Sequence, residues 1–343
     1  MGSERSSASE DWAEMTPSQY LRDFFPYEHV QLLLSLHAPL ERTEVALRGE
    51  SFFSRHNCAR DAEQLRELVT RPMIKEVHFG GVWPEMMSKR TAARMRPVAR
   101  PFVLDLDLDD FPAAAFFGVT KDDQEGCDAL LDCVLLGARV LERTLRDVFG
   151  FEKTATFYSG RRGVHLWVLD KRAFELSAEA RSAVVSALSP QGGTSIVAHP
   201  SFSSAVDLLV EGFPNLSCWK EQRFREAFAG KLDFRSVPAD WVTARDPWKR
   251  LLDLIPPSQL WMTDKLRRVV VAEAWPRVDA GAAAIDHLIK SPYSPHSSTG
   301  RIAVAVTPDF RPKTCPRLSE KASISSILKG FPLVSATVDP MEW

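Results

Sequence analysis

The sequence has no excess of basic charge and no long apolar run. Its 43 Lys and Arg residues are outnumbered by 45 Asp and Glu residues, which gives a formal net charge of -2. This balance excludes a protein that holds nucleic acid by neutralising phosphates over its whole surface, so any such contact has to be local. No apolar run approaches the roughly 18 residues that a membrane helix needs. The chain also begins without a hydrophobic targeting segment, and we expect a soluble intracellular protein that does not associate with membranes.

Cysteine is scarce as well. The cysteines are scattered and odd in number, which argues against a disulfide framework and favours a reducing compartment. They are Cys58, Cys127, Cys133, Cys218 and Cys315. The rest of the composition is typical of a globular protein, with 45% hydrophobic and 26% charged residues. A length of 343 residues exceeds one compact core, so we expect one large domain with an insertion, or two domains.

Local patterns predict a mixture of strands and helices. Strands are expected at 43–58 (two short strands), 102–109, 154–158 and 164–169. Helices are expected to begin at Thr16-Pro17 and at Ser177, and another covers 131–148 and ends at Gly150. Residues 190–270 have helix-like patterns without a chemical motif, and we interpret them as a helical insertion.

Two acidic residues share one face of an expected strand. Over 102–109 apolar residues alternate with acids, which places Asp105 and Asp107 on the same side, about 7 Å apart. Two carboxylates at that spacing can share hard cations such as Mg²⁺ or Mn²⁺. A half-exposed edge strand with a solvated acidic face produces the same pattern, so the pair alone leaves both interpretations open.

The loop between the strands at 154–158 and 164–169 gathers groups that bind phosphate. Ser159, Arg161, Arg162 and His165 fall within seven residues, beside glycines that allow close approach of the backbone to a ligand. Arg binds phosphate oxygens through paired, charge-assisted hydrogen bonds, so the loop suits a triphosphate. A basic hairpin turn at the surface is the alternative interpretation.

A third group of candidate residues lies far downstream. Asp279 is a candidate third carboxylate of a metal site, and Lys290 and His296 are candidate phosphate ligands. Distance along the chain gives no reason for Asp279 to meet the first pair. A lone Asp after Pro-Arg-Val also suits a turn or a helix cap.

Five segments, in order along the chain, resemble the DNA primase small subunit of archaea and eukaryotes. They are residues 20–27 (YLRDFFPY), 104–107 (LDLD), 158–168 (YSGRRGVHLWV), 277–279 (RVD) and 288–296 (LIKSPYSPH). The third of them is similar to the signature of the eukaryotic subunit. Chance agreement of one segment is easy, whereas agreement of five in family order is not.

The resemblance implies a role for each matching residue. Asp105, Asp107 and Asp279 would hold two catalytic ions, Mg²⁺ or Mn²⁺. The nucleotide would be bound by Ser159, Arg161, Arg162, His165, Lys290 and His296. Arg55 occupies the place of a family residue near the initiating nucleotides, and Glu44 is a further, weaker match.

The resemblance also implies a fold and a reaction. The fold is a mixed α/β (α+β) primase-type catalytic core, formed by residues 1–190 and 271–343, with a small helical subdomain inserted at 191–270. The reaction is the synthesis of RNA primers from nucleoside triphosphates on a single-stranded DNA template, by two-metal nucleotidyl transfer at the start of replication. Relatives work with a primase large subunit and, in eukaryotes, with a DNA polymerase alpha-type complex, which implies a protein of the nucleus.

One feature departs from the family pattern. The family usually has four cysteines, forming a structural zinc site, between the metal-binding strand and the next helix, and this interval contains only Cys127 and Cys133. Their separation is unlike the short spacing of zinc ligands, and on a helix they would lie on nearly opposed faces. We therefore expect no four-cysteine zinc site, unless distant residues such as Cys218 or Cys315 complete one.

Two other functions share these features. A primase-polymerase of DNA repair or damage tolerance would extend DNA ends, but its loop usually has a different sequence and it tends to be fused to other domains. A catalytically silent subunit of a replication complex would normally lack one of the carboxylates, and all three are present.

Overall fold

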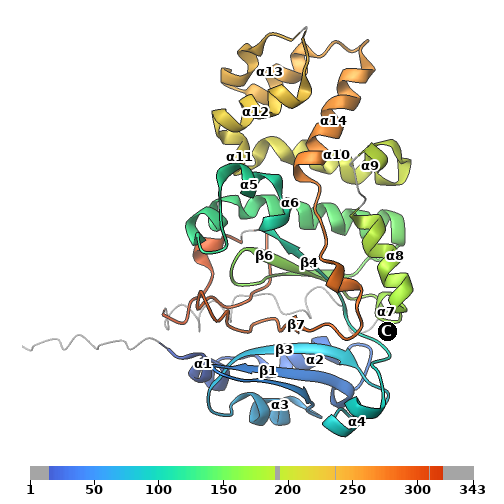
Figure 1. Cartoon of the computed structure of the whole chain (residues 1–343), viewed down its shortest axis with the longest axis vertical. Helices are drawn as coiled ribbons and strands as arrows, with labels where there is room; N and C mark the ends of the chain where they lie inside the picture. The colour runs from blue at the N-terminus through green and yellow to red at the C-terminus, as the bar shows by residue number, and fades with distance from the viewer. Residues whose placement is uncertain (1–14, 190–193, 236, 309, 320–343) are drawn as a thin grey trace, which may run out of the picture.

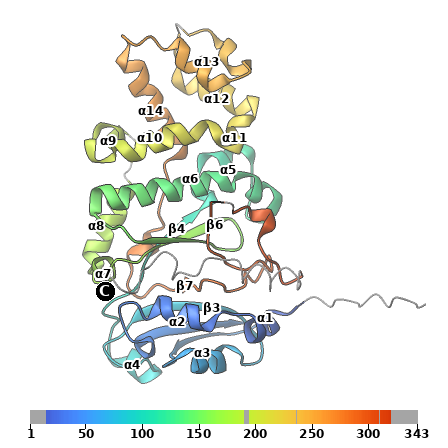
Figure 2. The same ribbon diagram turned by 180° about the vertical axis from the view of Figure 1, so that it is seen from behind.

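The computed structural model describes residues 15–189, 194–235, 237–308 and 310–319. These residues form an elongated stack of layers (Figures 1 and 2). A sheet with helices α1 to α4 lies at one end, a second sheet covered by α6 lies in the middle, and a block of helices lies at the other end. The two sheets face each other, and the chain that follows the helical block returns between them.

The first sheet is antiparallel, with strand order β2-β1-β3-β7. Its strands are β1 (Thr43–Gly49), β2 (Phe53–Asn57), β3 (Ile74–Val82) and β7 (Ile289–Lys290). The helices around it are α1 (Pro17–Asp23), α2 (Tyr27–Leu34), α3 (Ala62–Val69) and α4 (Lys89–Arg94). The predicted start of α1 is confirmed, because Thr16 and Gln19 cap each other's backbone N–H in a capping box.

The second sheet has the order β4-β6-β5 and is also antiparallel. It contains β4 (Phe102–Asp107), β5 (Thr154–Tyr158) and β6 (Gly163–Val168), and its helices are α5 (Pro112–Phe117), α6 (Gln124–Phe149), α7 (Lys171–Phe174) and α8 (Ala178–Leu188). Leu104 and Leu106 are buried on one face of β4, so alternation places Asp105 and Asp107 on the other face, where the charge of Lys290 from β7 acts on Asp105. Gly150, at φ 68°, ends α6 as predicted.

The helical block consists of helices alone within the described part of 194–274. They are α9 (Thr194–Ala198), α10 (Ser203–Gly212), α11 (Ser217–Lys220), α12 (Gln222–Leu232), α13 (Pro247–Leu254) and α14 (Leu260–Ala274). Trp219 is the centre of an aromatic cluster there, with ring centroids 5.1 Å from Phe228 and 5.2 Å from Trp248. The block packs directly on α6, so tightly that a Cβ on Gly212 would lie 2.6 Å from Leu136 Cδ1.

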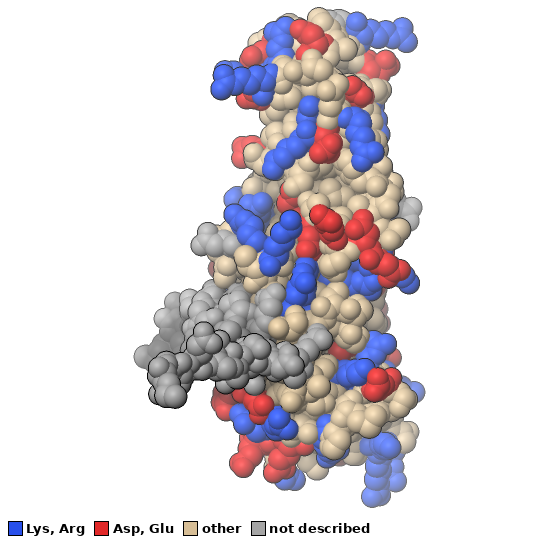
Figure 3. All heavy atoms as spheres, turned by 90° about the vertical axis from the view of Figure 1, so that its left-hand side faces the viewer, with Lys and Arg blue, Asp and Glu red and all other residues tan. Residues whose placement is uncertain are grey.

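The mixed α/β class is confirmed by the two antiparallel sheets and the helices around them. The boundaries 1–190, 191–270 and 271–343 stay a prediction. Among the described helices none is both long and apolar enough to cross a membrane. On the face shown in Figure 3, basic and acidic side chains are interspersed, in keeping with the small net charge.

The chain after α14 connects the two sheets and thereby forms the site. β7 pairs with β3, with Lys290 opposite His78. Farther along, the Tyr158 N–H donates to the Val304 carbonyl at 2.8 Å, which extends the second sheet beyond β5. The segment that contains Asp279, Lys290 and His296 is therefore held against both sheets.

Candidate active site

The three predicted carboxylates belong to one acidic cluster. The backbone N–H of Asp279 donates to the Asp105 carbonyl at 3.2 Å, which brings the late segment to β4. Burial raises the pKa of Asp105, and together with the nearby charges of Asp107, Asp279 and Asp110 it brings that pKa to about 7. A bound cation would favour the ionised form of this carboxyl.

Two of these carboxylates are engaged by the protein itself. Arg162 Nε lies 2.8 Å from Asp107 Oδ1, and Asp279 Oδ1 accepts a hydrogen bond from the Gly281 N–H at 2.5 Å. Accordingly, no three His, Cys, Asp or Glu side chains in the described ranges form a ready-made metal cage. The cluster nevertheless fits Mg²⁺ or Mn²⁺ in its donor type, because these ions prefer carboxylate oxygens.

The loop Ser159–Arg162 closes the β5–β6 hairpin, with the Ser159 N–H donating to the Gly163 carbonyl at 2.9 Å. Gly160 has φ 95°, and a Cβ there would lie 2.8 Å from His296 Cβ. At Gly163 an added Cβ would lie 2.5 Å from the Leu106 carbonyl. Glycine is thus required at both positions, because the loop packs closely against β4 and against the late segment.

The two arginines of this loop point in different directions. Arg161 pairs with Asp122 at 3.1 Å and donates to the Lys121 carbonyl, so its side chain points to the loop before α6. Arg162 lies between two acids, since its Nη1 is 2.8 Å from Asp109 Oδ2 while its Nε contacts Asp107. Arg162 therefore connects the predicted phosphate loop to the acidic cluster.

The predicted histidines are neutral, and His165 is buried whereas His296 is half-buried. His165 lies opposite Asp105 in the β4–β6 register, with Nε2 3.8 Å from Asp105 Oδ1. Burial, with a further contribution from the Lys290 charge, lowers the pKa of His165 to about 3 and that of His296 to about 3. Both rings therefore act near neutral pH as neutral hydrogen-bonding groups.

Lys290 connects the first sheet to the Ser159–Arg162 loop. Its Nζ lies 3.5 Å from the Ser159 carbonyl, to which it donates, and burial lowers its pKa to about 8 against the opposing effect of Glu76. The charged form still predominates at pH 7. A buried ammonium beside the phosphate loop is suited to bind an anionic ligand.

Glu76 is a site residue that the sequence did not indicate. Its side chain is 2% exposed, and its carboxylate lies 3.7 Å from Lys290 Nζ, 3.2 Å from His78 Nε2 and 3.6 Å from Arg48 Nη1. Burial alone would raise the pKa of Glu76, but His78, Lys290 and Ser297 together lower it far below its usual range. Period-two spacing of Glu76 and His78 on β3 is a signal, but it becomes specific only when β7 is known to pair there.

Arg55 lies on β2, at the edge of the first sheet. It binds the fully buried Glu44 with two hydrogen bonds, of 2.8 and 3.0 Å, and donates to the Asp286 carbonyl at 3.1 Å. Asp286 precedes His287, whose ring packs near Gly281 and hence near Asp279. Arg55 is thus linked to the acidic cluster through this segment, and within the described residues its side-chain hydrogen bonds go to Glu44 and Asp286 rather than to the Ser159–Arg162 loop.

The cysteines of the interval after β4 both lie on α6 and are buried. Cys127 Sγ donates to the Thr120 carbonyl at 3.5 Å, and Cys133 Sγ lies 4.0 Å from Cys218 Sγ. The preceding helix α5 is held by aromatic packing, with the Phe116 and Phe117 rings 5.2 and 5.9 Å from that of Phe224.

The absence of a structural zinc stays a prediction that elemental analysis can test. Protein purified without chelator is expected to contain well below one zinc per chain after dialysis, because a closed zinc site needs four thiolate or imidazole ligands. A near-stoichiometric zinc content that survives dialysis would contradict this. A Cys127→Ser variant that retained the same zinc would then place the ion elsewhere.

The chain is similar to several known proteins. The model of the DNA primase small subunit family matches residues 104–308. The DNA primase small subunit of Schizosaccharomyces pombe is 22% identical over 352 residues, 89% of this chain and 76% of the relative. That of Drosophila melanogaster is 26% identical over 76% of this chain and 68% of its own length, and PriS of Halobacterium salinarum is 28% identical over 38% and 32%. The polymerase domain of Mycobacterium tuberculosis ligase D in complex with DNA is similar at a TM-score of 0.40 and 14% identity, covering 98% of each chain.

Proposed function

The chain belongs to the DNA primase small subunit family, and on that premise we propose that it synthesises RNA primers on single-stranded DNA from nucleoside triphosphates. The observation that carries the proposal is the juxtaposition of two opposite charge clusters. Asp105, Asp107 and Asp279 form an acidic cluster that Arg162 neutralises only in part, and Lys290 beside the Ser159–Arg162 loop forms a cationic counterpart. A nucleotide with its metal ions carries the complementary charges.

The residues of the site have different roles, which follow from the charge of their side chains. Asp105, Asp107 and Asp279 would hold two divalent ions, which when bound activate the attacking 3′-hydroxyl and neutralise the leaving pyrophosphate. Lys290 and Arg162 offset the charge of the triphosphate and fix its position. His165 and His296, being neutral, donate or accept single hydrogen bonds without repelling a cation.

We expect Arg162 to bind acidic side chains when no nucleotide is present and phosphate oxygens when a nucleotide is bound. Without nucleotide its guanidinium binds Asp107 and Asp109, which keeps the acidic cluster partly neutralised. With a triphosphate and its metal ions bound, Asp107 would be a metal ligand and Arg162 would bind phosphate oxygens. Each group would then have a partner of opposite charge in both states.

The direct test uses a single-stranded template, ribonucleotides and Mg²⁺ or Mn²⁺. Short RNA products that depend on template and on metal are expected. If the protein instead extends existing DNA ends with deoxyribonucleotides and starts no chain, it is a primase-polymerase of another role. If it binds template and makes no product under any of these conditions, it is a silent subunit. We propose further that a primase large subunit and a polymerase alpha-type complex are its partners, which co-purification tests.

Arg162→Ala is expected to weaken nucleotide binding about tenfold, as expected for the loss of a charge-assisted hydrogen bond to phosphate. Binding of single-stranded DNA should change little. The same variant should bind Mn²⁺ more tightly in the absence of nucleotide, because Arg162 no longer competes for Asp107. Fluorescence titration with labelled nucleotide and a free-Mn²⁺ measurement decide both points.

A matched control is Arg268→Ala, which removes an arginine that pairs with Asp264 at 2.7 Å on the surface of α14. It should alter neither nucleotide nor metal affinity. If Arg162→Ala binds nucleotide with the affinity of the wild type, the Ser159–Arg162 loop is a surface turn and not a phosphate-binding loop.

A further inference from the structure

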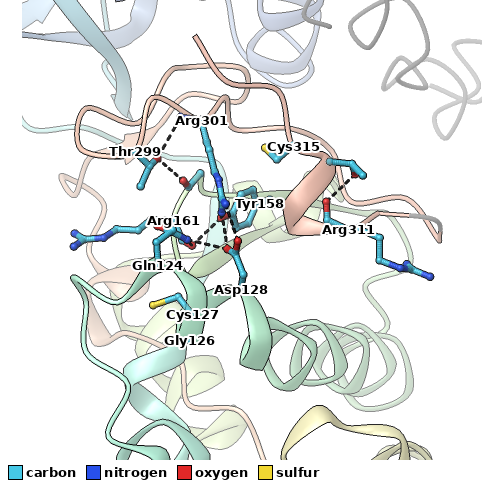
Figure 4. A network of polar contacts seen from close by, with 12 residues as sticks. Gln124, Gly126, Cys127, Asp128, Tyr158, Arg161, Thr299, Arg301, Arg311 and Cys315 are labelled. Atoms are coloured by element: carbon cyan, nitrogen blue, oxygen red, sulfur yellow. Dashed lines mark hydrogen bonds and ion pairs between the residues drawn. The ribbon is translucent and has the colours of Figure 1, made fainter. Parts of the chain in front are cut away.

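A buried ion pair lies directly behind the Ser159–Arg162 loop. Arg301 is 1% exposed and binds Asp128, a residue of α6 (Figure 4). Two hydrogen bonds join them, from Nη1 to Oδ1 at 2.6 Å and from Nη2 to Oδ2 at 2.7 Å. Asp128 comes from α6, and Arg301 comes from the segment after β7. Neither residue is among the predicted metal or phosphate ligands.

Tyr158 connects this ion pair to the Ser159–Arg162 loop through two hydrogen bonds. Its hydroxyl accepts a hydrogen bond from Arg301 Nη1 at 2.9 Å and donates one to the Arg161 carbonyl at 2.7 Å. Gln124 Nε2 donates to the same carbonyl at 2.9 Å and to Asp128 Oδ1 at 2.9 Å. The Arg161 carbonyl is thus held from two sides by residues that Arg301 and Asp128 fix.

Thr299 holds the preceding peptide. Its hydroxyl donates to the Gly160 carbonyl at 2.7 Å and accepts from the Arg301 N–H at 3.2 Å. Two successive loop carbonyls are therefore tied to one network. We name Asp128, Tyr158, Thr299 and Arg301 the brace.

The orientation of the carbonyls determines that of the N–H groups. No peptide bond in the described chain is cis, and in a trans peptide the C=O and the following N–H point in opposite directions. Because the Arg161 carbonyl points to the Tyr158 hydroxyl and to Gln124 of α6, the Arg162 N–H points away from these two side chains. Backbone N–H groups presented in this way bind phosphate oxygens.

We propose that the brace consists of positioning residues, which hold the Ser159–Arg162 loop in the conformation that binds the triphosphate without touching it. The inference rests on the proposed function. It explains why a fully buried ion pair is placed there, since such a pair contributes little net stability compared with apolar residues of the same volume. It also gives Thr299 and Arg301 a role in nucleotide binding that their distance along the chain from the loop conceals.

The test removes single hydroxyl groups of the brace. Tyr158→Phe and Thr299→Val should each raise the dissociation constant for a labelled nucleoside triphosphate about five- to tenfold, and the KM in primer synthesis by the same factor, while kcat changes less than about twofold. Thr299→Ser keeps the hydroxyl and should retain the affinity of the wild type. Nucleotide binding is measured without template, so it does not depend on catalysis.

Tyr27→Phe is the matched control, because the Tyr27 hydroxyl is also buried and donates to a backbone carbonyl, that of Leu21 at 2.5 Å, among the N-terminal helices. It should lower the unfolding midpoint in urea as Tyr158→Phe does and leave the nucleotide affinity unchanged. Equal loss of affinity in Tyr27→Phe and Tyr158→Phe, or affinity within twofold of the wild type in both brace variants, overturns the proposal. Wild-type protein that binds nucleotide and makes no primers overturns the proposed function alone, whereas failure to bind nucleotide overturns both.

Discussion

Replacing Asp105 and Asp107 together by Ala is expected to lower primer synthesis by at least about a thousandfold, equivalent to about 4 kcal/mol of lost transition-state stabilisation. The acidic cluster would keep Asp279 alone, and one carboxylate cannot hold the two ions that the reaction requires. Radiolabelled primers resolved on a denaturing gel give the measurement. Raising the Mn²⁺ concentration should not restore the product.

The same double variant is expected to be no less stable than the wild type in metal-free buffer. The charges of Asp107 and Asp279 raise the pKa of Asp105 because they repel its ionised form. Removing two members of the cluster removes that repulsion, although Arg162 then loses Asp107 and keeps only Asp109. Urea unfolding in the presence of a chelator compares the two proteins.

The control is the double variant Asp240→Ala and Asp253→Ala, which removes the same charge from exposed positions of the helical block. It should make primers at the rate of the wild type. If instead the Asp105 and Asp107 variant folds and still makes primers, the assignment of the metal site to β4 is wrong.

The sequence was sufficient to predict the elements on which the site is built. Strand β4 could be predicted from its alternation of apolar and acidic residues, and the end of α6 from Gly150, whereas α6 begins at Gln124, seven residues before the predicted start at 131. The hairpin of β5 and β6 was equally local, because its loop glycines mark it. Each of these signals lies within a few residues of the feature it predicts.

Contacts between distant segments were beyond the reach of such patterns. The connection of Asp279 to Asp105 is a backbone hydrogen bond across 174 positions, and nothing near Asp279 differs from an ordinary cap. Glu76 joins the site only because β7, two residues long, pairs with β3 and brings Lys290 alongside. The Arg161 side chain points away from Arg162 because it contacts Lys121 and Asp122, which lie in another loop.

The other large effect expected is on stability, and it concerns Asp128. Asp128→Ala should lower the free energy of unfolding by about 3–5 kcal/mol, because it leaves the guanidinium of Arg301 buried without its counter-charge. The side chains of the pair are 1% and 6% exposed, so water cannot replace the lost carboxylate. Urea unfolding, followed by tryptophan fluorescence, measures the change. Asp264→Ala is the control, since its pair with Arg268 is half exposed and should contribute less than about 1 kcal/mol.

A second variant separates the loss of the pair from the burial of an unpaired charge. Asp128→Leu combined with Arg301→Met replaces both ions by apolar side chains and should recover most of the stability that Asp128→Ala loses. It cannot restore the hydrogen bond that Arg301 Nη1 donates to the Tyr158 hydroxyl, so its affinity for nucleoside triphosphate should remain lowered. If the double variant is as unstable as Asp128→Ala, apolar side chains cannot replace the ion pair at this position. If it binds nucleoside triphosphate with the affinity of the wild type, the Ser159–Arg162 loop keeps its conformation without the pair.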